Sequence, residues 1–235
     1  RNITTGTLNT IIGGLAGDAI TTGNSNVAVG YEALSADTLG DRNVAIGLQA
    51  LLTQNFTTST DSYNTAVGYA AGLAVTTGVQ NTLIGGLAGD ALTDADYNTA
   101  VGYSALTSDT LGSRSVAMGN GSLATQNFTT STNAYNVALG YDAGNDLTTG
   151  VNNTLIGGLT GDALTDADHN LAVGQFALSS DTLGSRTVAL GNNALSTQNF
   201  TTATDTYNVA VGYNAGTAVT TGTLNTLIGG LAGDA

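Results

Sequence analysis

The sequence predicts an all-β protein, a parallel β-solenoid or β-roll built from 17- and 21-residue coils. One short phrase recurs thirteen times: Asn, a β-branched or small residue, Ala or Leu, an aliphatic residue, then Gly. β-Branched residues alternate with small ones inside the phrase, which is typical of short strands. Every copy runs in the same direction at nearly constant spacing. Stacked parallel strands therefore fit the chain better than hairpins.

The spacing of the phrase sets the length of each coil. The steps between successive copies are 17, 17, 21 and 17 residues, and this set recurs every 72 residues. We therefore expect one repetitive solenoid segment of a longer fibre. It covers 1–235, with super-repeats at about 9–80, 81–152 and 153–224 and a partial one at 225–235.

Composition excludes several classes of function. The chain has 33 Gly, no Cys and a single His, and only 9% of its residues are charged. The usual arrangements of nucleophile and base cannot be assembled, so we expect no enzyme and no cofactor. A net charge of −13 disfavours nucleic acid as a partner, because binding phosphates requires Lys and Arg. No apolar run approaches the ~20 residues of a membrane span, so we expect no membrane insertion.

Each strand is predicted to present one face to its own coil and the other to a second chain. In an extended phrase Val27 and Val29 share a face, and Asn26, Ala28 and Gly30 share the opposite one. We expect the Val/Ile face to fill the coil. The flat Ala face would then meet a neighbouring chain, with one large residue per super-repeat as a peg. The predicted chain–chain contact residues are Ala28, Ala45, Ala66, Leu83, Ala100, Ala117, Ala138, Leu155, Ala172, Ala189, Ala210 and Leu227.

A second pattern follows each phrase. The third residue after its glycine is small, and the next residue is Leu or Gly. This pattern predicts a second short strand that turns back over the first, giving two strands per coil. The Asn that opens the phrase, present in eleven of thirteen copies, could form a row of ligands. A ladder of amides bonded from coil to coil is the favoured interpretation.

Two groups of residues are candidates for binding. Three aspartates fall in one coil in "GDALTDAD" (Gly89–Asp96 and Gly161–Asp168), which suggests calcium ligands. The motif is not that of an EF-hand, and a surface turn is favoured instead. His169 is expected to be a solvated turn residue.

The four extra residues of each long coil are predicted to form outward loops. These loops lie at 53–62, 125–134 and 197–206, and each contains one Phe. Phe56, Phe128 and Phe200 could form surface platforms that stack on cell-surface glycans. Alternatively, each ring folds back to cap its loop or packs on a neighbouring chain, and this is favoured because exposed aromatic side chains usually have a partner.

The elements "NVAVG", "SVAMG" and "NVALG" resemble the repeats of trimeric autotransporter adhesin heads. The stretch "NTAVGYSALTSDTLGSRSVAMGNGSLATQNFTTSTNAYNVALGYDAG" is also similar to the long repeat arrays of bacteriophage tail-fibre proteins. The resemblance covers essentially the whole chain. It implies a left-handed parallel β-roll in which three chains pack about an axis, and it carries no catalytic residues.

The predicted function is therefore that of a shaft or head segment of a fibre. A phage tail fibre that supports host attachment is the leading interpretation, with an extracellular, virion location and a homotrimeric state. A bacterial trimeric adhesin or extracellular filament on the cell surface is the alternative. An ice-binding solenoid is less favoured, because the Thr residues cluster in turns and do not form Thr-x-Thr on flat strands.

Overall fold

The computed structural model describes residues 3–235, and over this range the protein is all-β, without a helix. It is a parallel β-solenoid of thirteen turns, which confirms the predicted fold class. The chain divides into two compact units. The first contains the residues up to Ser115 together with Phe128–Thr132, and the second contains Val116–Asn127 and Asn133–Ala235.

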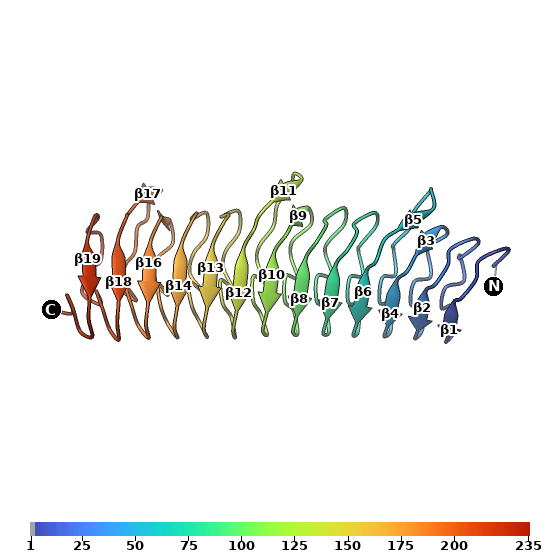
Figure 1. Ribbon diagram of the computed structural model, residues 1–235, viewed down its shortest axis with the longest axis horizontal. Helices are drawn as coiled ribbons and strands as arrows, with labels where there is room; N and C mark the ends of the chain where they lie inside the picture. The colour runs from blue at the N-terminus through green and yellow to red at the C-terminus, as the bar shows by residue number, and fades with distance from the viewer. Residues whose placement is uncertain (1–2) are drawn as a thin grey trace. The chain divides into compact units, whose positions relative to one another are not determined.

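The sheet of each unit consists of three-residue strands that are parallel neighbours (Figure 1). Equal positions of successive coils pair in register, as in Ala28↔Ala45. In the first unit the order is β1 (Thr10–Ile12), β2 (Val27–Val29), β4 (Val44–Ile46), β6 (Thr65–Val67), β7 (Thr82–Ile84) and β8 (Thr99–Val101). In the second it is β10 (Val116–Met118), β12 (Val137–Leu139), β13 (Thr154–Ile156), β14 (Leu171–Val173), β16 (Val188–Leu190), β18 (Val209–Val211) and β19 (Thr226–Ile228).

The predicted second strand in every coil is wrong. The residues after each phrase glycine form turns, because two of them adopt a left-handed conformation, as Glu32 (φ 56°) and Leu34 (φ 51°) do. Other strands are two residues long and occur only beside the long coils. They are β3 (Gly40–Asp41), β5 (Thr60–Asp61), β9 (Gly112–Ser113), β11 (Thr132–Asn133), β15 (Gly184–Ser185) and β17 (Thr204–Asp205). Of these, β3 pairs with β5 and β15 with β17.

The predicted inside and outside of the strands are reversed. The middle residue of the strand points into its own coil, and its neighbours Val, Ile or Thr point out. The whole predicted contact row is 0% exposed within one chain, so it cannot meet a second chain. The residues concerned are Ala28, Ala45, Ala66, Leu83, Ala100, Ala117, Ala138, Leu155, Ala172, Ala189, Ala210 and Leu227. The tight corners leave an interior so narrow that small side chains fit it and paired Val or Ile side chains do not.

The large residues that were predicted to reach a second chain, such as Leu83, instead fill space inside their own coil. Leu83 lies between Gly72 of the preceding coil and Gly89 of its own. A Cβ on Gly72 would lie 2.7 Å from Leu83 Cδ1, and one on Gly89 would lie 2.7 Å from Leu83 Cδ2. Coils that neither carry nor precede a Leu or Ile at the strand centre have Leu where these glycines stand, as at Leu51 and Leu106. The glycines on either side of Leu83 therefore leave the space that its side chain fills, as a close-packed interior requires.

Candidate functional site

Asparagine side chains join successive coils through their interior, as the sequence predicts. In the first unit Asn81 Oδ1 accepts a hydrogen bond from the Asn98 N–H of the next coil at 2.9 Å. Asn81 Nδ2 donates to the Ala95 carbonyl, fourteen residues on, at 2.8 Å. Asn153 in the second unit makes the same two bonds, to the Asn170 N–H and the Ala167 carbonyl. Each amide therefore both closes its own coil and binds the next, so the ladder is structural.

The ladder changes where the coil is long. Its two departures from Asn, Ser115 and Thr187, both open 21-residue coils. The remaining 21-residue coil opens with Asn43, which keeps the amide. The buried Nδ2 of Asn43 has no hydrogen-bond partner. The inserted residues displace the carbonyl that this group would reach in a 17-residue coil. This relation between side chain and coil length was not part of the sequence prediction, although the two substitutions signalled it.

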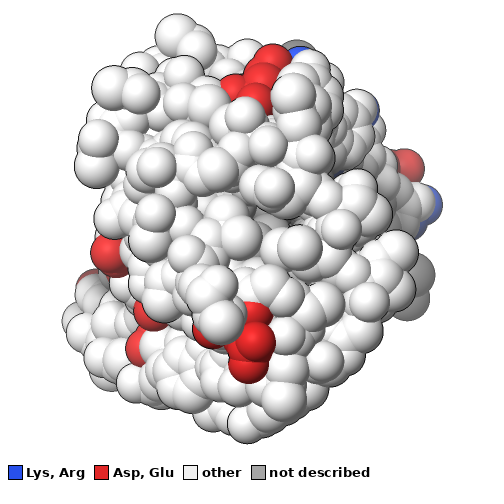
Figure 2. Space-filling model, turned by 90° about the vertical axis from the view of Figure 1, so that its left-hand side faces the viewer, with Lys and Arg blue, Asp and Glu red and all other residues white. Residues whose placement is uncertain are grey.

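Aspartates of the two "GDALTDAD" stretches bind neighbouring coils. Asp96 Oδ1 accepts from the Val79 N–H at 2.8 Å, and Asp94 Oδ1 accepts from Thr77 Oγ1 at 2.7 Å. Asp90 Oδ1 accepts from Thr107 Oγ1 in the following coil at 2.5 Å. Among residues 3–235 no three His, Cys, Asp or Glu side chains are grouped as a metal ion would require. Figure 2 shows acidic side chains in separate places at the C-terminal end of the molecule.

A row of threonine hydroxyls also bonds from coil to coil. Thr76 Oγ1 donates to the Thr93 carbonyl at 3.2 Å, and Thr93 Oγ1 donates to the Thr110 carbonyl at 3.0 Å. Thr148 and Thr165 repeat these contacts in the second unit. These hydroxyls already donate to the backbone, so they do not form a free lattice of donors.

A buried polar network supports each inserted loop. Beneath the first loop Asp37, which is only 1% exposed and lies in the coil before the long one, accepts from the Gly40 N–H, the Phe56 N–H and Gln54 Nε2. Gln54 Oε1 in turn accepts from Asn64 Nδ2 at 2.9 Å. Burial raises the pKa of Asp37, and these hydrogen bonds oppose the rise. Asp181 and Gln198 form the same network under the third loop.

The loop phenylalanines are not surface platforms. Phe56, Phe128 and Phe200 are only 5%, 6% and 7% exposed. The prediction that they form a surface contact is therefore wrong, and the alternative that each ring folds back beneath its loop is confirmed. Residues between the ring and β5, including Thr57 and Thr58, are exposed, as predicted for an outward loop.

Arginine and tyrosine side chains flank the strands on the outside. Arg42 forms an ion pair with Asp61 and lies over the Tyr63 ring at 5.6 Å, and Arg186 pairs with Asp205. These pairs are about half exposed, so each contributes little to stability. His169 is exposed, as predicted.

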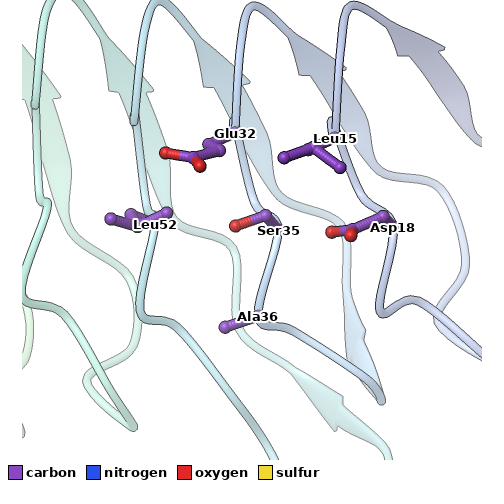
Figure 3. Close-up of a pocket in the computed structure, with 6 residues that line it drawn as sticks. All are labelled: Leu15, Asp18, Glu32, Ser35, Ala36 and Leu52. Carbon is purple, nitrogen blue, oxygen red and sulfur yellow. The ribbon is translucent and has the colours of Figure 1, made fainter.

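An open groove crosses the first three coils (Figure 3). Its volume is about 360 Å³, and its lining consists of Leu15, Asp18, Glu32, Ser35, Ala36 and Leu52. Glu32 Oε2 accepts from Gln49 Nε2 at 2.9 Å. The lining carries two carboxylates, Asp18 and Glu32, and one hydroxyl, Ser35.

Over residues 3–235 no helix has the length and apolar character needed to cross a bilayer. Comparisons with family models, with curated proteins and with solved structures gave no match for this chain.

Proposed function

We propose that this chain is a structural segment of an extracellular fibre made of three copies, and that the fibre is a phage tail fibre supporting host attachment. The observation that carries the proposal is the continuity of the polar ladders. Within each unit every strand pairs with the next, and Asn, Thr and Asp side chains add hydrogen bonds between many successive coils. Such a stack suits a load-bearing element, because each coil gains its stability from its neighbours.

The chemistry of the described residues also favours a mechanical role. The buried polar side chains bind backbone groups of adjacent coils, and the carboxylates are dispersed along the chain. A cell-surface glycan is the partner we propose for the fibre as a whole. Calcium remains a secondary proposal for the aspartates.

A bacterial trimeric adhesin or extracellular filament is the second candidate, supported by the resemblance of the repeats. An ice-binding solenoid is less favoured, because the Thr76 and Thr93 hydroxyls bond to the backbone of the next coil. Purified protein should therefore cause no thermal hysteresis, and a measured hysteresis would favour ice binding over the fibre.

Immunogold electron microscopy tests the assignment directly. Antibodies raised against the purified chain are applied to tailed virions and to bacterial cells from the source. Gold along thin fibres at the virion tail is the expected result. Gold on bacterial surface filaments would transfer the proposal to the adhesin, and labelling of neither structure would overturn both.

A further inference from the structure

Beneath the third inserted loop a buried hydroxyl lies against a buried side-chain amide. Thr187 opens the long coil, Gln198 lies at the start of its loop, and both side chains are 0% exposed. Gln198 Nε2 donates a hydrogen bond to Thr187 Oγ1 at 3.2 Å, so a lone pair of the hydroxyl oxygen faces the amide. The amide carbon is bonded to Nε2 at ~1.3 Å and therefore lies within ~4.5 Å of that oxygen. The fold thus brings a nucleophile close to an electrophile where water is excluded.

Two neighbours bind the Gln198 amide in the way that acyl transfer requires. Asn208 Nδ2 donates to Gln198 Oε1 at 2.8 Å, which is the distance expected of a donor that stabilises a developing oxyanion. Asp181 Oδ2 accepts from Nε2 at 2.6 Å and would stabilise positive charge on this nitrogen as it gains a proton. Asp181 and Asn208 are at most 1% exposed, so solvent does not weaken either effect.

The hydroxyl is held in place as well. Thr187 Oγ1 lies 2.7 Å from Thr206 Oγ1, and the Thr187 N–H donates to Asn170 Oδ1 at 2.9 Å. A nucleophile that is ordered in advance loses less entropy when it reacts. In the second loop Ala134 stands in the place of Thr206, so we confine the inference to the third loop.

We infer that Thr187 Oγ1 and Gln198 Cδ become joined by an ester bond that the folded chain forms by itself. The Oγ1–Cδ bond forms and the Cδ–Nε2 bond breaks. Once the carbon is tetrahedral, Nε2 is a basic amine, takes the proton that the hydroxyl loses and leaves as ammonia. The reaction needs no oxidant, metal or further reactant. Exclusion of water from the site protects the ester from hydrolysis.

The ester closes residues 187–198 into a ring, so that the first residue of the long coil holds the start of its loop covalently. The inference depends neither on the number of chains in the assembly nor on the proposed fibre.

The first loop has the same amide arrangement without the nucleophile. Gln54 Nε2 donates to Asp37 Oδ2 at 2.6 Å, and Gln54 Oε1 accepts from Asn64 Nδ2 at 2.9 Å. Asn43 stands where the third loop has Thr187. A carboxamide nitrogen is not nucleophilic, so the first loop should stay unlinked and serves as a control within the same chain.

Mass spectrometry of the wild-type protein is the first test. Each long coil begins directly after an arginine, so trypsin releases the three loops from the denatured chain in separate peptides, 43–114, 115–186 and 187–235. Peptide 187–235 should weigh ~17 Da less than its sequence, the mass of one ammonia, and peptide 43–114 should have its full mass. Thr187→Val replaces the hydroxyl by a methyl group and should restore the full mass of 187–235. A wild-type peptide 187–235 of full mass overturns the inference and leaves a hydrogen-bonded network only.

Fragmentation of peptide 187–235 then locates the loss. Cleavage of one peptide bond inside the ring releases no fragment, so the ester predicts a gap in the fragment series over residues 187–198. A continuous series through this range would place the loss elsewhere, for example at an asparagine imide, and would overturn the inference. Mild base should hydrolyse the ester in the unfolded peptide, which adds ~18 Da and leaves a carboxyl in place of the Gln198 amide.

The last experiment installs the reaction in the first loop. Asn43→Thr with Ser62→Thr gives that loop the two hydroxyls of the third, and peptide 43–114 of the folded variant should then also lose ~17 Da. The matched control, Asn43→Val with Ser62→Thr, should keep its full mass. Full mass in the folded double-threonine variant would contradict the claim that these side chains suffice. The wild-type measurement requires no variant, so a variant that fails to fold does not affect it.

Discussion

The 21-residue coils at 43–63 and 187–207 have similar sequences but complete their interiors with different side chains. Asn43 accepts a hydrogen bond from Ser62 Oγ at 2.9 Å, and its own Nδ2 is buried without a partner. Thr187 and Thr206 instead bond hydroxyl to hydroxyl at 2.7 Å, and Thr206 accepts from the Asn208 N–H. An amide suits a 17-residue coil, where a carbonyl lies in reach. A hydroxyl suits the longer coil, because it can be satisfied by a single neighbour.

The two coils agree in the network beneath the loop. Asp37 and Asp181 lie in the coils just before the long ones, at the position where other coils carry an aliphatic residue such as Leu92 or Leu164, and each binds a Gln one coil later. The inserted loop therefore needs a buried hydrogen-bond acceptor for its backbone N–H groups. The side chain at the first position of the long coil can be either Asn or Thr.

The largest effect is expected from removing that acceptor. Asp181→Ala would leave the Gly184 N–H, the Phe200 N–H and Gln198 Nε2 buried without it. We expect a loss of about 3 kcal/mol in the free energy of unfolding of the second unit, measured by chemical denaturation. Asp166→Ala, which removes an exposed carboxylate of the same unit, is the control and should change stability by less than ~0.5 kcal/mol. Equal stability of the two variants would contradict a supporting role for the network.

A smaller gain is expected from moving the threonine pair into the first unit. Asn43→Thr with Ser62→Thr removes the unpaired amide donor and recreates the Thr187–Thr206 bond. We expect about 1 kcal/mol of added stability, at the low end of the cost of a buried unsatisfied group. Thr187→Asn in the second unit is the reverse exchange and should lose a similar amount. If the double variant were destabilised, the Asn43 amide would have a partner that this explanation omits.

The smallest effect concerns one aspartate that differs in its surroundings between super-repeats. Asp90 receives a hydrogen bond from Thr107, but Asp162 Oδ1 is buried without a partner. Burial raises the pKa of Asp162 above its usual value of 3.8, and Asp146 and Asp142 add to the rise. A carboxyl with a raised pKa in the folded state binds its proton more tightly there than in the unfolded chain. Its contribution to stability is therefore full below pH 3.8 and is lost as pH rises through the raised pKa.

Asp162→Asn should accordingly raise the melting temperature of the second unit at pH 7, and the gain should shrink below pH 4, a range set by the direction of the shift. Thermal unfolding at several pH values measures this. Asp90→Asn is the matched control and should show no gain at pH 7, because it weakens the bond from Thr107. A gain of the same size in both variants would point to net charge and not to the site.

Much of the local structure follows from the sequence because it depends on spacing and on backbone chemistry. The 72-residue period predicts which residues stack, and the register of Ala28 on Ala45 agrees with it. The recurrent Asn predicts a ladder, since an amide both donates and accepts. The Asp–Gln pairs beneath the loops could also have been predicted, because Asp replaces the aliphatic residue that other coils carry at the same position. The sequence analysis did not predict them.

The sequence by itself therefore determined the parallel solenoid, its coil lengths, its outward loops and its amide ladder. Which face of each strand lies inside was decided only by the tertiary structure. Period-2 alternation divides a strand into two faces without saying which is buried, and hydrophobicity favoured the Val/Ile face. Closure of the coil through left-handed corners such as Leu34 and Arg42 leaves room at the strand centre only for Ala, or for Leu83 between two glycines. The steric limit of this narrow interior outweighs the hydrophobic gain from burying the larger side chains, and these remain on the outside.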